Sequence, residues 1–386
     1  MADSQSRRIL LLSAYDAGSH RRWREQLAEH LKEHSWTVLS LPPRNFAWRN
    51  RGNALSWALG SREVLTDNYD CLLATSMTDL SALKGMAPGL ASLPSIVYYH
   101  ENQFAYPERF ERKGGQNYMI TNLYTALAAD IAVFNSRYNR DSFLDGVEKL
   151  LDMVPDFIPA GVVDELKSRS VVVPVPLEAH CYADHDSPSS DVPLTIVWNH
   201  RWEYDKAPER FFDALYDVSR RNGNFRLHVL GERFRECPEV FEEAKDKLSK
   251  HIDTWGFVED AVEYRRILTT SDVVISTSLH EFQGVALLEA VAAGCVPLVP
   301  DRLAYMEYLP DSFRFPSYPE DPAAESAELS RRLLEMIQDP ESVRALTPPD
   351  VSYLSWNNLA GEYRNIINQV VGRSRIQGPK SKIDVK

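Results

Sequence analysis

Short apolar runs alternate with amphipathic stretches along most of the chain. In the first half, runs rich in Ile, Leu and Val predict strands at Ile9–Ser13, Trp36–Leu41, Cys71–Thr75, Ile96–Tyr99, Ile131–Asn135 and Val171–Val173. Apolar positions at helical spacing between them predict helices at Trp23–His34, Asn117–Ala128 and Ser136–Leu150. Because strands that alternate with helices pair in parallel, this half predicts a doubly wound α/β domain.

The same alternation starts again in the second half. Strands are predicted at Leu194–Trp198, Leu227–Leu230, Asp253–Trp255, Val273–Ser276 and Val296–Val299, with helices near Pro208–Arg220, Val240–Ser249, Val262–Thr269 and Val285–Ala293. Two doubly wound domains in tandem would face each other across a cleft at the carboxyl ends of their strands, where such sheets bind ligands.

The 386 residues divide at a change in composition. We expect a first Rossmann-like domain at 1–177, a polar, Pro/Ser-rich linker at 178–193 and a second Rossmann-like domain at 194–352. A helix at 353–371 is expected to pack back on the first domain, and the basic tail 372–386 is expected to be disordered.

Charge is distributed unevenly. The chain has 43 Lys and Arg against 55 Asp and Glu, a net charge of −12, which argues against a protein held on nucleic acid by bulk charge. Residues 1–176 hold 19 basic and 20 acidic residues, so nearly all the excess acid lies in the remainder. Residues 42–62 contain no acid, and Arg44, Arg49 and Arg51 alternate there with aromatic residues. In such a segment the arginines can bind the RNA backbone while the aromatic side chains stack on its bases. Alternatively, the aromatic side chains belong to the hydrophobic core, and both interpretations remain open.

Other simple classes find little support. The four cysteines are far apart and form no metal-binding or disulfide pattern, so we expect a reducing cytoplasm and no metal site. No apolar run approaches the length of a membrane span, and no membrane partner is expected.

Two glutamates in the second domain form the most specific motif, HEFQGVALLEAVAAGCVPLV. Glu281 is expected in the loop after a strand, Gly284 at the start of the next helix and Glu289 inside it. The backbone N–H groups at that helix start favour a diphosphate or sugar hydroxyls, and both carboxylates can accept hydrogen bonds from a sugar or a ribose. The alternative is a solvated acidic helix face, which the apolar Val285–Leu288 between the acids disfavours.

A second motif, WNHRWEYDKAPERF, follows the first strand of the second domain. Arg201 and Lys206 fall in a strand-to-helix loop, where a forked donor and a point charge suit a diphosphate. The alternative is surface ion pairing with Glu203 or Asp205.

Three loops of the first domain also follow strands. Gly18 permits close backbone approach and Ser19 is a plausible helix cap. His100 and Glu101 end another strand, where the histidine could bind a reacting sugar or serve structure alone. Asn135 and Ser136 end the next strand, and capping of the following helix is the stronger interpretation for Ser136.

Several motifs together resemble a known family. They are AYDAGSH, LPPRNFAWRNRGNAL, YYHENQFAYP, FNSRYNRDSF, VWNHRWEYDKAPERFF, VLGERF, WGFV and ISTSLHEFQGVALLEAV, spread over about residues 9 to 310. The pattern resembles the retaining GT-B glycosyltransferases of family 4 and, more closely, the tRNA-queuosine α-mannosyltransferase group.

The resemblance implies transfer of mannose from GDP-mannose to the cyclopentenediol of queuosine in tRNA, with retention and without a cofactor or metal. It implies catalytic roles for His100, Arg201, Lys206 and Glu281. The expected nucleotide-sugar site is Gly18, Arg201, Lys206, Gly256, Phe257, Val258, Glu281, Phe282, Gln283, Gly284, Val285 and Glu289. The expected acceptor and tRNA site is Ser19, His20, Arg44, Trp48, Arg49, Arg51, Glu101, Asn102, Asn135 and Ser136.

Within that implied site, Arg201 and Lys206 would hold the diphosphate, Glu289 the ribose and Glu281 the transferred hexose. Gln283 departs from the aromatic or small residue common at its place, which leaves the hexose open. Two alternatives remain: a family 4 transferase that uses another nucleotide sugar on a lipid or small molecule, and a non-catalytic nucleotide-sugar-binding regulator.

Overall fold

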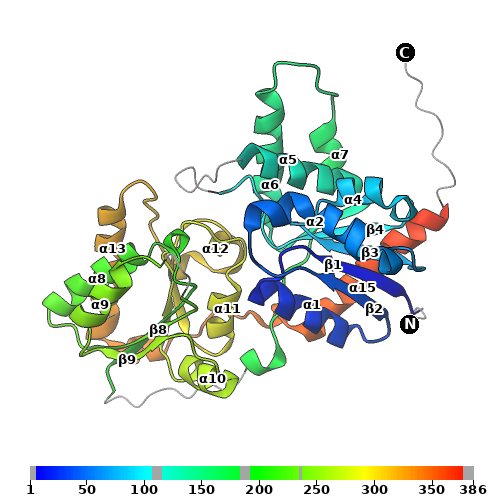
Figure 1. Cartoon of the computed structure of the whole chain (residues 1–386). Helices are drawn as coiled ribbons and strands as arrows, with labels where there is room; N and C mark the ends of the chain where they lie inside the picture. The colour runs from blue at the N-terminus through cyan, green and yellow to red at the C-terminus, as the bar shows by residue number, and fades with distance from the viewer. Residues whose placement is uncertain (1–5, 107–114, 183–191, 234–236, 377–386) are drawn as a thin grey trace. The chain divides into compact units, whose positions relative to one another are not determined.

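The computed structural model describes residues 6–106, 115–182, 192–233 and 237–376. The chain forms two compact units, Met1–Pro176 with Asn357–Lys386 and Leu177–Trp356 (Figure 1). Each unit contains a parallel six-stranded sheet with helices packed on it. The predicted doubly wound α/β fold is therefore confirmed for both halves.

The sheet of the first unit has the order β2-β1-β3-β4-β5-β6. Its strands are β1 Arg8–Ser13, β2 Ser35–Ser40, β3 Cys71–Thr75, β4 Ser95–Tyr99, β5 Ile131–Phe134 and β6 Ser170–Val172. Its longer helices are α1 Gly18–His30, α2 Phe46–Gly60, α4 Leu80–Met86, α5 Gly115–Ala128, α6 Arg137–Asp152, α7 Val162–Ser168 and α15 Trp356–Ile376. β1, β3, β4 and β5 are apolar and buried on both faces, as central parallel strands require.

Helix α15 closes the core of the first unit from the far end of the chain. The Trp23 indole N–H donates to the Tyr363 hydroxyl at 3.1 Å, and that hydroxyl donates to the Tyr98 hydroxyl at 3.0 Å. The helix runs to Ile376 and so includes residues 372–376, for which disorder was predicted. The rest of the predicted disordered tail lies outside the described residues.

The sheet of the second unit has the order β12-β11-β10-β7-β8-β9. Its strands are β7 Leu194–Asn199, β8 Phe225–Leu230, β9 Ile252–Gly256, β10 Val273–Ile275, β11 Val296–Pro300 and β12 Arg314–Phe315. Its longer helices are α8 Pro208–Arg220, α9 Val240–Lys247, α10 Ala261–Thr269, α11 Val285–Ala292, α13 Pro322–Gln338 and α14 Pro340–Arg344. Rings of Trp198, Phe211, Phe212 and Phe241 form the centre of its core.

The predicted elements match the observed ones closely where the apolar pattern is strong. Helices α2, α4, α7, α13 and α14 and strand β12 are present although no separate element was predicted there. Within the predicted linker, Ala179–Cys181 forms a 3₁₀ turn, and residues 183–191 lie outside the described part of the chain.

Candidate functional site

The order of strands in the second unit places two loops side by side. β7 lies between β10 and β8, so the chain changes direction across the sheet at β7. The loop after β7 carries Lys206 and the loop after β10 carries Glu281. In doubly wound sheets, ligands bind at the carboxyl ends of the strands that flank such a switch point.

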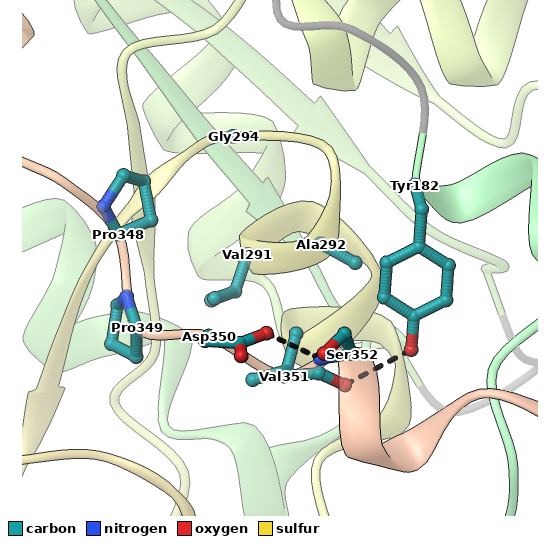
Figure 2. Close-up of a pocket in the computed structure, with 9 residues that line it drawn as sticks. All are labelled: Tyr182, Val291, Ala292, Gly294, Pro348, Pro349, Asp350, Val351 and Ser352. Carbon is teal, nitrogen blue, oxygen red and sulfur yellow. Dashed lines mark hydrogen bonds between the residues drawn. The ribbon is translucent and has the colours of Figure 1, made fainter. Parts of the chain in front are cut away.

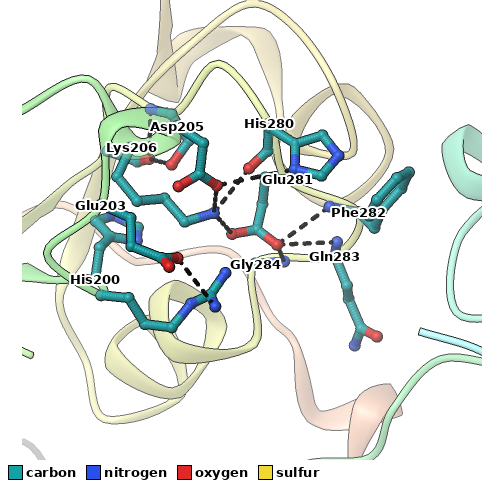
Figure 3. Close-up of polar contacts among 12 residues, drawn as sticks. His200, Glu203, Asp205, Lys206, His280, Glu281, Phe282, Gln283 and Gly284 are labelled. Carbon is teal, nitrogen blue, oxygen red and sulfur yellow. Dashed lines mark hydrogen bonds and ion pairs between the residues drawn. The ribbon is translucent and has the colours of Figure 1, made fainter. Parts of the chain in front are cut away.

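Lys206 is the buried cation of this site (Figure 3). Its ammonium nitrogen donates to the His280 carbonyl at 2.7 Å and lies 3.1 Å from Asp205 Oδ2 and 3.2 Å from Glu281 Oε2. Only 7% of its side chain is exposed. The ion pair with Asp205 that the sequence left open is present, but it is buried rather than a surface contact.

Glu281 also caps its own loop. Its Oε1 accepts the backbone N–H groups of Phe282 at 3.1 Å and Gly284 at 3.0 Å, and Gln283 N lies 3.5 Å away (Figure 3). Gly284 has a φ of 81°, in the left-handed region that favours glycine, and Val285 begins α11. Part of the N–H array expected for a diphosphate is therefore occupied by Glu281 in this structure.

Glu289 lies inside α11 and is only 4% exposed. The Tyr264 hydroxyl donates to its Oε2 at 3.3 Å, and Asn199 Nδ2 reaches Tyr264 at 3.2 Å and the Ala286 carbonyl at 2.7 Å. A buried carboxylate needs such partners. The alternative of a solvated acidic face is therefore wrong for Glu289.

Arg201 differs from Lys206 in exposure. Its guanidinium lies 3.0 Å from Glu203 Oε2, and 54% of its side chain is exposed. The surface ion pair left open by the sequence is therefore present. The same geometry leaves the guanidinium available to an anion, because an exposed pair exchanges partners at small cost.

Two glycines shape the neighbouring loops. Gly256, at the end of β9, has a φ of 113° and precedes Phe257, which is 65% exposed, and the half-buried Val258. Gly231, after β8, has a φ of 139°, and a Cβ there would lie 1.8 Å from the His200 carbonyl oxygen. The loops after β7 and β8 thus approach each other as closely as backbone allows.

The charges at the switch point hold one another ionised. Burial alone would lower the pKa of Lys206, but the carboxylates of Asp205 and Glu281 outweigh it and raise that pKa. Burial would raise the pKa of Glu281, but Lys206 and His200 bring it below its usual value. The arrangement therefore keeps a cation and two carboxylates charged away from water.

His200 and Tyr305 complete this site, although neither was singled out from the sequence. Burial and then Lys206 lower the pKa of His200 to about 4, so its ring is neutral near pH 7. The Tyr305 hydroxyl lies 2.6 Å from Ser276 Oγ, and its ring would lie 3.1 Å from a Cβ at Gly284. The position of His200 directly after β7 was an available signal, whereas Tyr305 reaches the Gly284 turn by a tertiary contact that the sequence does not mark.

A second buried pair supports the Glu281 loop from below. Arg302 donates from Nε to the Ser278 carbonyl at 2.8 Å, from Nη2 to the Thr277 carbonyl at 2.8 Å and from Nη2 to Glu325 Oε1 at 2.8 Å. Thr277 in turn donates to the Lys206 carbonyl at 2.9 Å. One network of side chains thus fixes both loops of the site.

In the first unit, His100 and His20 form a stacked pair at the end of β4. Their ring centroids lie 4.3 Å apart, and Trp23 meets His100 edge-on at 4.7 Å. Burial and then the neighbouring His20 hold the pKa of His100 well below its ordinary value. His100 is therefore neutral near pH 7, which suits a hydrogen bond to a hydroxyl better than charge neutralisation.

Helix α1 begins differently from the prediction. Gly18 is its first residue and Ala17 its N-cap, so Ser19 is not the cap. The Ala17 carbonyl accepts the Arg21 N–H at 2.8 Å, so the helix starts two residues too early for Ser19 to cap it. A Cβ at Gly18 would meet no atom within 4 Å, so its backbone is open to approach.

Three predicted acceptor residues serve the local structure. Asn102 Oδ1 accepts the N–H groups of Phe104 and Ala105, and its Nδ2 donates to Asn139. Asn135 Nδ2 donates to the His100 carbonyl at 2.8 Å, and Ser136 caps α6 by accepting the Asn139 N–H at 2.9 Å. Capping, the stronger interpretation for Ser136, is confirmed. Glu101 is half-buried and accepts from the Tyr106 hydroxyl at 3.3 Å.

The aromatics of the acid-free segment divide between core and surface. Trp57 is buried and Phe46 is half-buried against Tyr15 and Tyr118, whereas Trp48 is 53% exposed. Arg44 and Arg51 are exposed and Arg49 is half-buried. Arg51 Nη1 lies 3.4 Å from Oδ2 of Asp79, the N-cap residue of α4, so the segment without acids contacts an acid from elsewhere in the chain.

A separate pocket lies at the far end of α11 (Figure 2). Val291, Ala292 and Gly294 form one side of it, and the Pro348–Pro349 segment faces Tyr182 across it. The Tyr182 hydroxyl donates to the Val351 carbonyl at 3.0 Å. None of the site residues predicted from the sequence lines this pocket.

Two negative findings apply to the residues that the structure describes. They contain no group of three or more His, Cys, Asp or Glu side chains placed to hold a metal ion. Across the same residues, every helix is too short or too polar to cross a membrane.

The sequence matches two family profiles and a curated relative. Residues 8–177 match the family profile described as tRNA-queuosine alpha-mannosyltransferase N-terminal, and residues 184–348 match Glycosyl transferases group 1. A tRNA-queuosine alpha-mannosyltransferase of Drosophila melanogaster is 36% identical over 311 residues, which are 78% of this chain and 81% of that protein.

More distant matches come from one curated sequence and from solved structures. A GDP-mannose:cellobiosyl-diphosphopolyprenol alpha-mannosyltransferase of Xanthomonas oryzae pv. oryzae is 22% identical over 47% of this chain and 49% of that protein. The sucrose-phosphate synthase of Thermosynechococcus elongatus has a TM-score of 0.72 and 12% identity over 95% of this chain and 99% of that one. Anabaena HepE in complex with UDP and glucose has a TM-score of 0.59 and 15% identity over 96% and 98%.

These structural neighbours confirm the predicted GT-B fold, and the group 1 profile confirms a glycosyltransferase that uses a nucleotide-sugar donor. The predicted family is confirmed as well, because the insect relative matches most of both chains. The chain belongs to the tRNA-queuosine alpha-mannosyltransferase family.

Proposed function

We propose that this glycosyltransferase moves mannose from GDP-mannose to the cyclopentenediol of queuosine in tRNA, with retention at the anomeric carbon. The observation that carries the proposal is the buried Lys206 between Asp205 and Glu281 at the switch point of the second unit. That arrangement suits a substrate whose leaving group is a diphosphate. The relative that shares 36% identity is named for the same transfer.

Charge neutralisation is the main demand of this chemistry. As the bond from the anomeric carbon to the diphosphate breaks, negative charge grows on the leaving oxygen, and preorganised cations stabilise that state. Lys206 and Arg201 would provide the positive charge, and Glu281 would accept a hydrogen bond from a hydroxyl of the hexose. All three N–H donors of Lys206 already have acceptors, so a diphosphate would replace one of them.

Retention would follow from attack on the same face that the diphosphate leaves. The acceptor hydroxyl oxygen bonds to the anomeric carbon, the carbon–phosphate oxygen bond breaks, and the hydroxyl proton passes to the departing GDP. Neutral His100 would orient the sugar by a hydrogen bond. Its Nε2 is buried and has no hydrogen-bond partner among the described residues.

The test is mass spectrometry of nucleosides from queuosine-containing tRNA incubated with the protein and a sugar donor. GDP-mannose should add one hexose to queuosine, whereas UDP-glucose should add none. Matched tRNA with guanosine in place of queuosine is the acceptor control. A hexose gained from UDP-glucose alone would refute the donor, and no gain from either donor would refute the reaction.

A further inference from the structure

Trp48 presents a large aromatic surface in the first turn of α2. The side chain is 53% exposed. The preceding segment adjoins the end of β1, because the Leu41 N–H donates to the Ser13 carbonyl at 2.9 Å. β1 and β3 flank the point where strand order reverses in this sheet. Trp48 is therefore exposed on a helix that starts at the ligand-binding edge of the first unit.

The indole ring rests directly on Gly52, one turn further along α2. A Cβ at Gly52 would lie 2.4 Å from Trp48 Cε2 and 2.6 Å from Cδ2, so any other residue would displace the ring. Glycine inside a helix costs about 1 kcal/mol relative to alanine. The glycine thus lets one face of the indole lie flat against the helix while the other stays exposed.

The helix beneath the ring is anchored on both sides of it. Phe46 packs edge-on against Tyr15 at 5.7 Å and Tyr118 at 5.3 Å. Asn53 donates from Nδ2 to the Met77 carbonyl at 3.2 Å, and its Oδ1 accepts the Asp79 N–H at 3.0 Å. Trp48 therefore sits on a helix with little freedom to move, so a ligand would not have to order it.

The charge around the ring favours an anionic partner. Arg44 and Arg49 precede and follow Trp48 in the sequence, and residues 42–62 contain no acidic residue. Arg44 is exposed and Arg49 is half-buried. Asp79 partly neutralises the charge of Arg51, which also donates to Thr121 Oγ1 at 3.1 Å. The positive charge next to Trp48 in the sequence therefore comes mainly from the other two arginines. Guanidinium groups beside an exposed aromatic face match the phosphates and bases of single-stranded RNA.

We propose that Trp48, seated on Gly52, is the stacking platform for one unpaired base of the tRNA acceptor, with Arg44 and Arg49 on the adjoining phosphates. This inference rests on the proposed tRNA acceptor and adds how the protein holds it. An apolar partner is the competing occupant, since Leu55 and Leu59 on the same helix are 42% and 75% exposed. A base stack requires Trp48 and Gly52 but not Leu59.

The test compares Trp48→Ala, Trp48→Phe, Gly52→Ala and Leu59→Ala in the full chain. Binding to a queuosine-containing tRNA is measured by fluorescence anisotropy at several salt concentrations, alongside KM, kcat and melting temperature. Trp48→Ala and Gly52→Ala should each weaken tRNA binding about tenfold and raise KM while kcat holds. Trp48→Phe should recover most of the affinity, and Leu59→Ala should match the wild type.

The salt dependence separates stacking from charge. Loss of the indole should leave the slope of affinity against salt unchanged, whereas Arg44→Ala with Arg49→Ala should reduce it. Affinity within twofold of the wild type in Trp48→Ala would overturn the platform. An equal loss in Leu59→Ala would overturn it too, because the loss of tRNA affinity would then not depend on the indole. If the wild type transfers mannose and Trp48→Ala binds tRNA normally, the platform alone is refuted. If the wild type neither binds tRNA nor transfers mannose, the proposed function is refuted as well.

Discussion

The ammonium nitrogen of Lys206 lies 3.2 Å from Oε2 of Glu281, a residue 75 positions further along the chain. Both side chains are largely buried, at 7% and 19% exposure. The two loops that carry them meet only because β7 and β10 are neighbours in the sheet. A buried ion pair of this kind is costly to break from one side, because the remaining charge loses its partner.

Lys206→Ala should therefore lower both stability and activity. Removal of the ammonium leaves Asp205 and Glu281 facing each other, and we expect a loss of about 3 kcal/mol in the free energy of unfolding, together with loss of turnover. Urea denaturation and the hexose-transfer assay measure the two effects. Lys247→Ala, which breaks an exposed pair with Glu243, is the matched control and should cost less than about 1 kcal/mol. A fully stable Lys206→Ala would contradict the buried pair.

Arg201→Ala should separate the two effects. The guanidinium is half exposed and its pair with Glu203 lies at the surface, so unfolding free energy should change by less than about 1 kcal/mol. Turnover should nevertheless fall at least tenfold if the guanidinium meets the leaving diphosphate. Arg226→Ala, which removes another half-exposed arginine pair on the same sheet, should leave turnover unchanged. Equal turnover in both variants would remove Arg201 from the mechanism.

Acid should destabilise the second unit through His200. Burial lowers its pKa from about 6.5 to about 4, so the neutral ring contributes stability in full above pH 6.5, and that stability is lost as the pH falls towards 4. A shift of this size corresponds to about 3 kcal/mol. Melting temperatures from pH 7 to pH 4 should fall less steeply in His200→Asn than in the wild type. His180→Asn, at an exposed position, is the control for the effect of the substitution itself.

The alternating apolar pattern predicted both parallel sheets because their central strands are buried on both faces. It could not predict β12, which has only two residues, or the packing of Trp48 on Gly52, which depends on one missing Cβ. The charged residues that follow the strands correctly predicted that Lys206 and Glu281 lie in the loops beside the switch point. Other partners come from tertiary contacts, on which spacing along the chain carries little information: Glu281 for Lys206, Asn139 for Asn102 and the His100 carbonyl for Asn135.

Arg302 offers a test of whether the Glu281 loop must be held in place. It binds the Thr277 and Ser278 carbonyls and Glu325 at once, which a lysine with one nitrogen cannot reproduce. Arg302→Lys should therefore weaken binding of the nucleotide sugar and lower kcat, while affinity for tRNA stays within twofold. The loss of unfolding free energy should be about 1 to 3 kcal/mol, since a buried charge loses part of its hydrogen bonding.

Arg344→Lys is the control that distinguishes a local effect from general loss of stability. Arg344 forms an equally buried pair with Asp272, at 2.8 Å, but Asp272 precedes β10 and so lies at the opposite edge of the sheet from Glu281. The two variants should lose similar stability in urea, yet only Arg302→Lys should lose donor affinity, measured by the rise in melting temperature with GDP-mannose. If Arg302→Lys and Arg344→Lys bind GDP-mannose with equal affinity, the Arg302–Glu325 pair stabilises the fold without positioning Glu281. Donor binding would then not depend on the hydrogen bonds that Arg302 makes to the Glu281 loop.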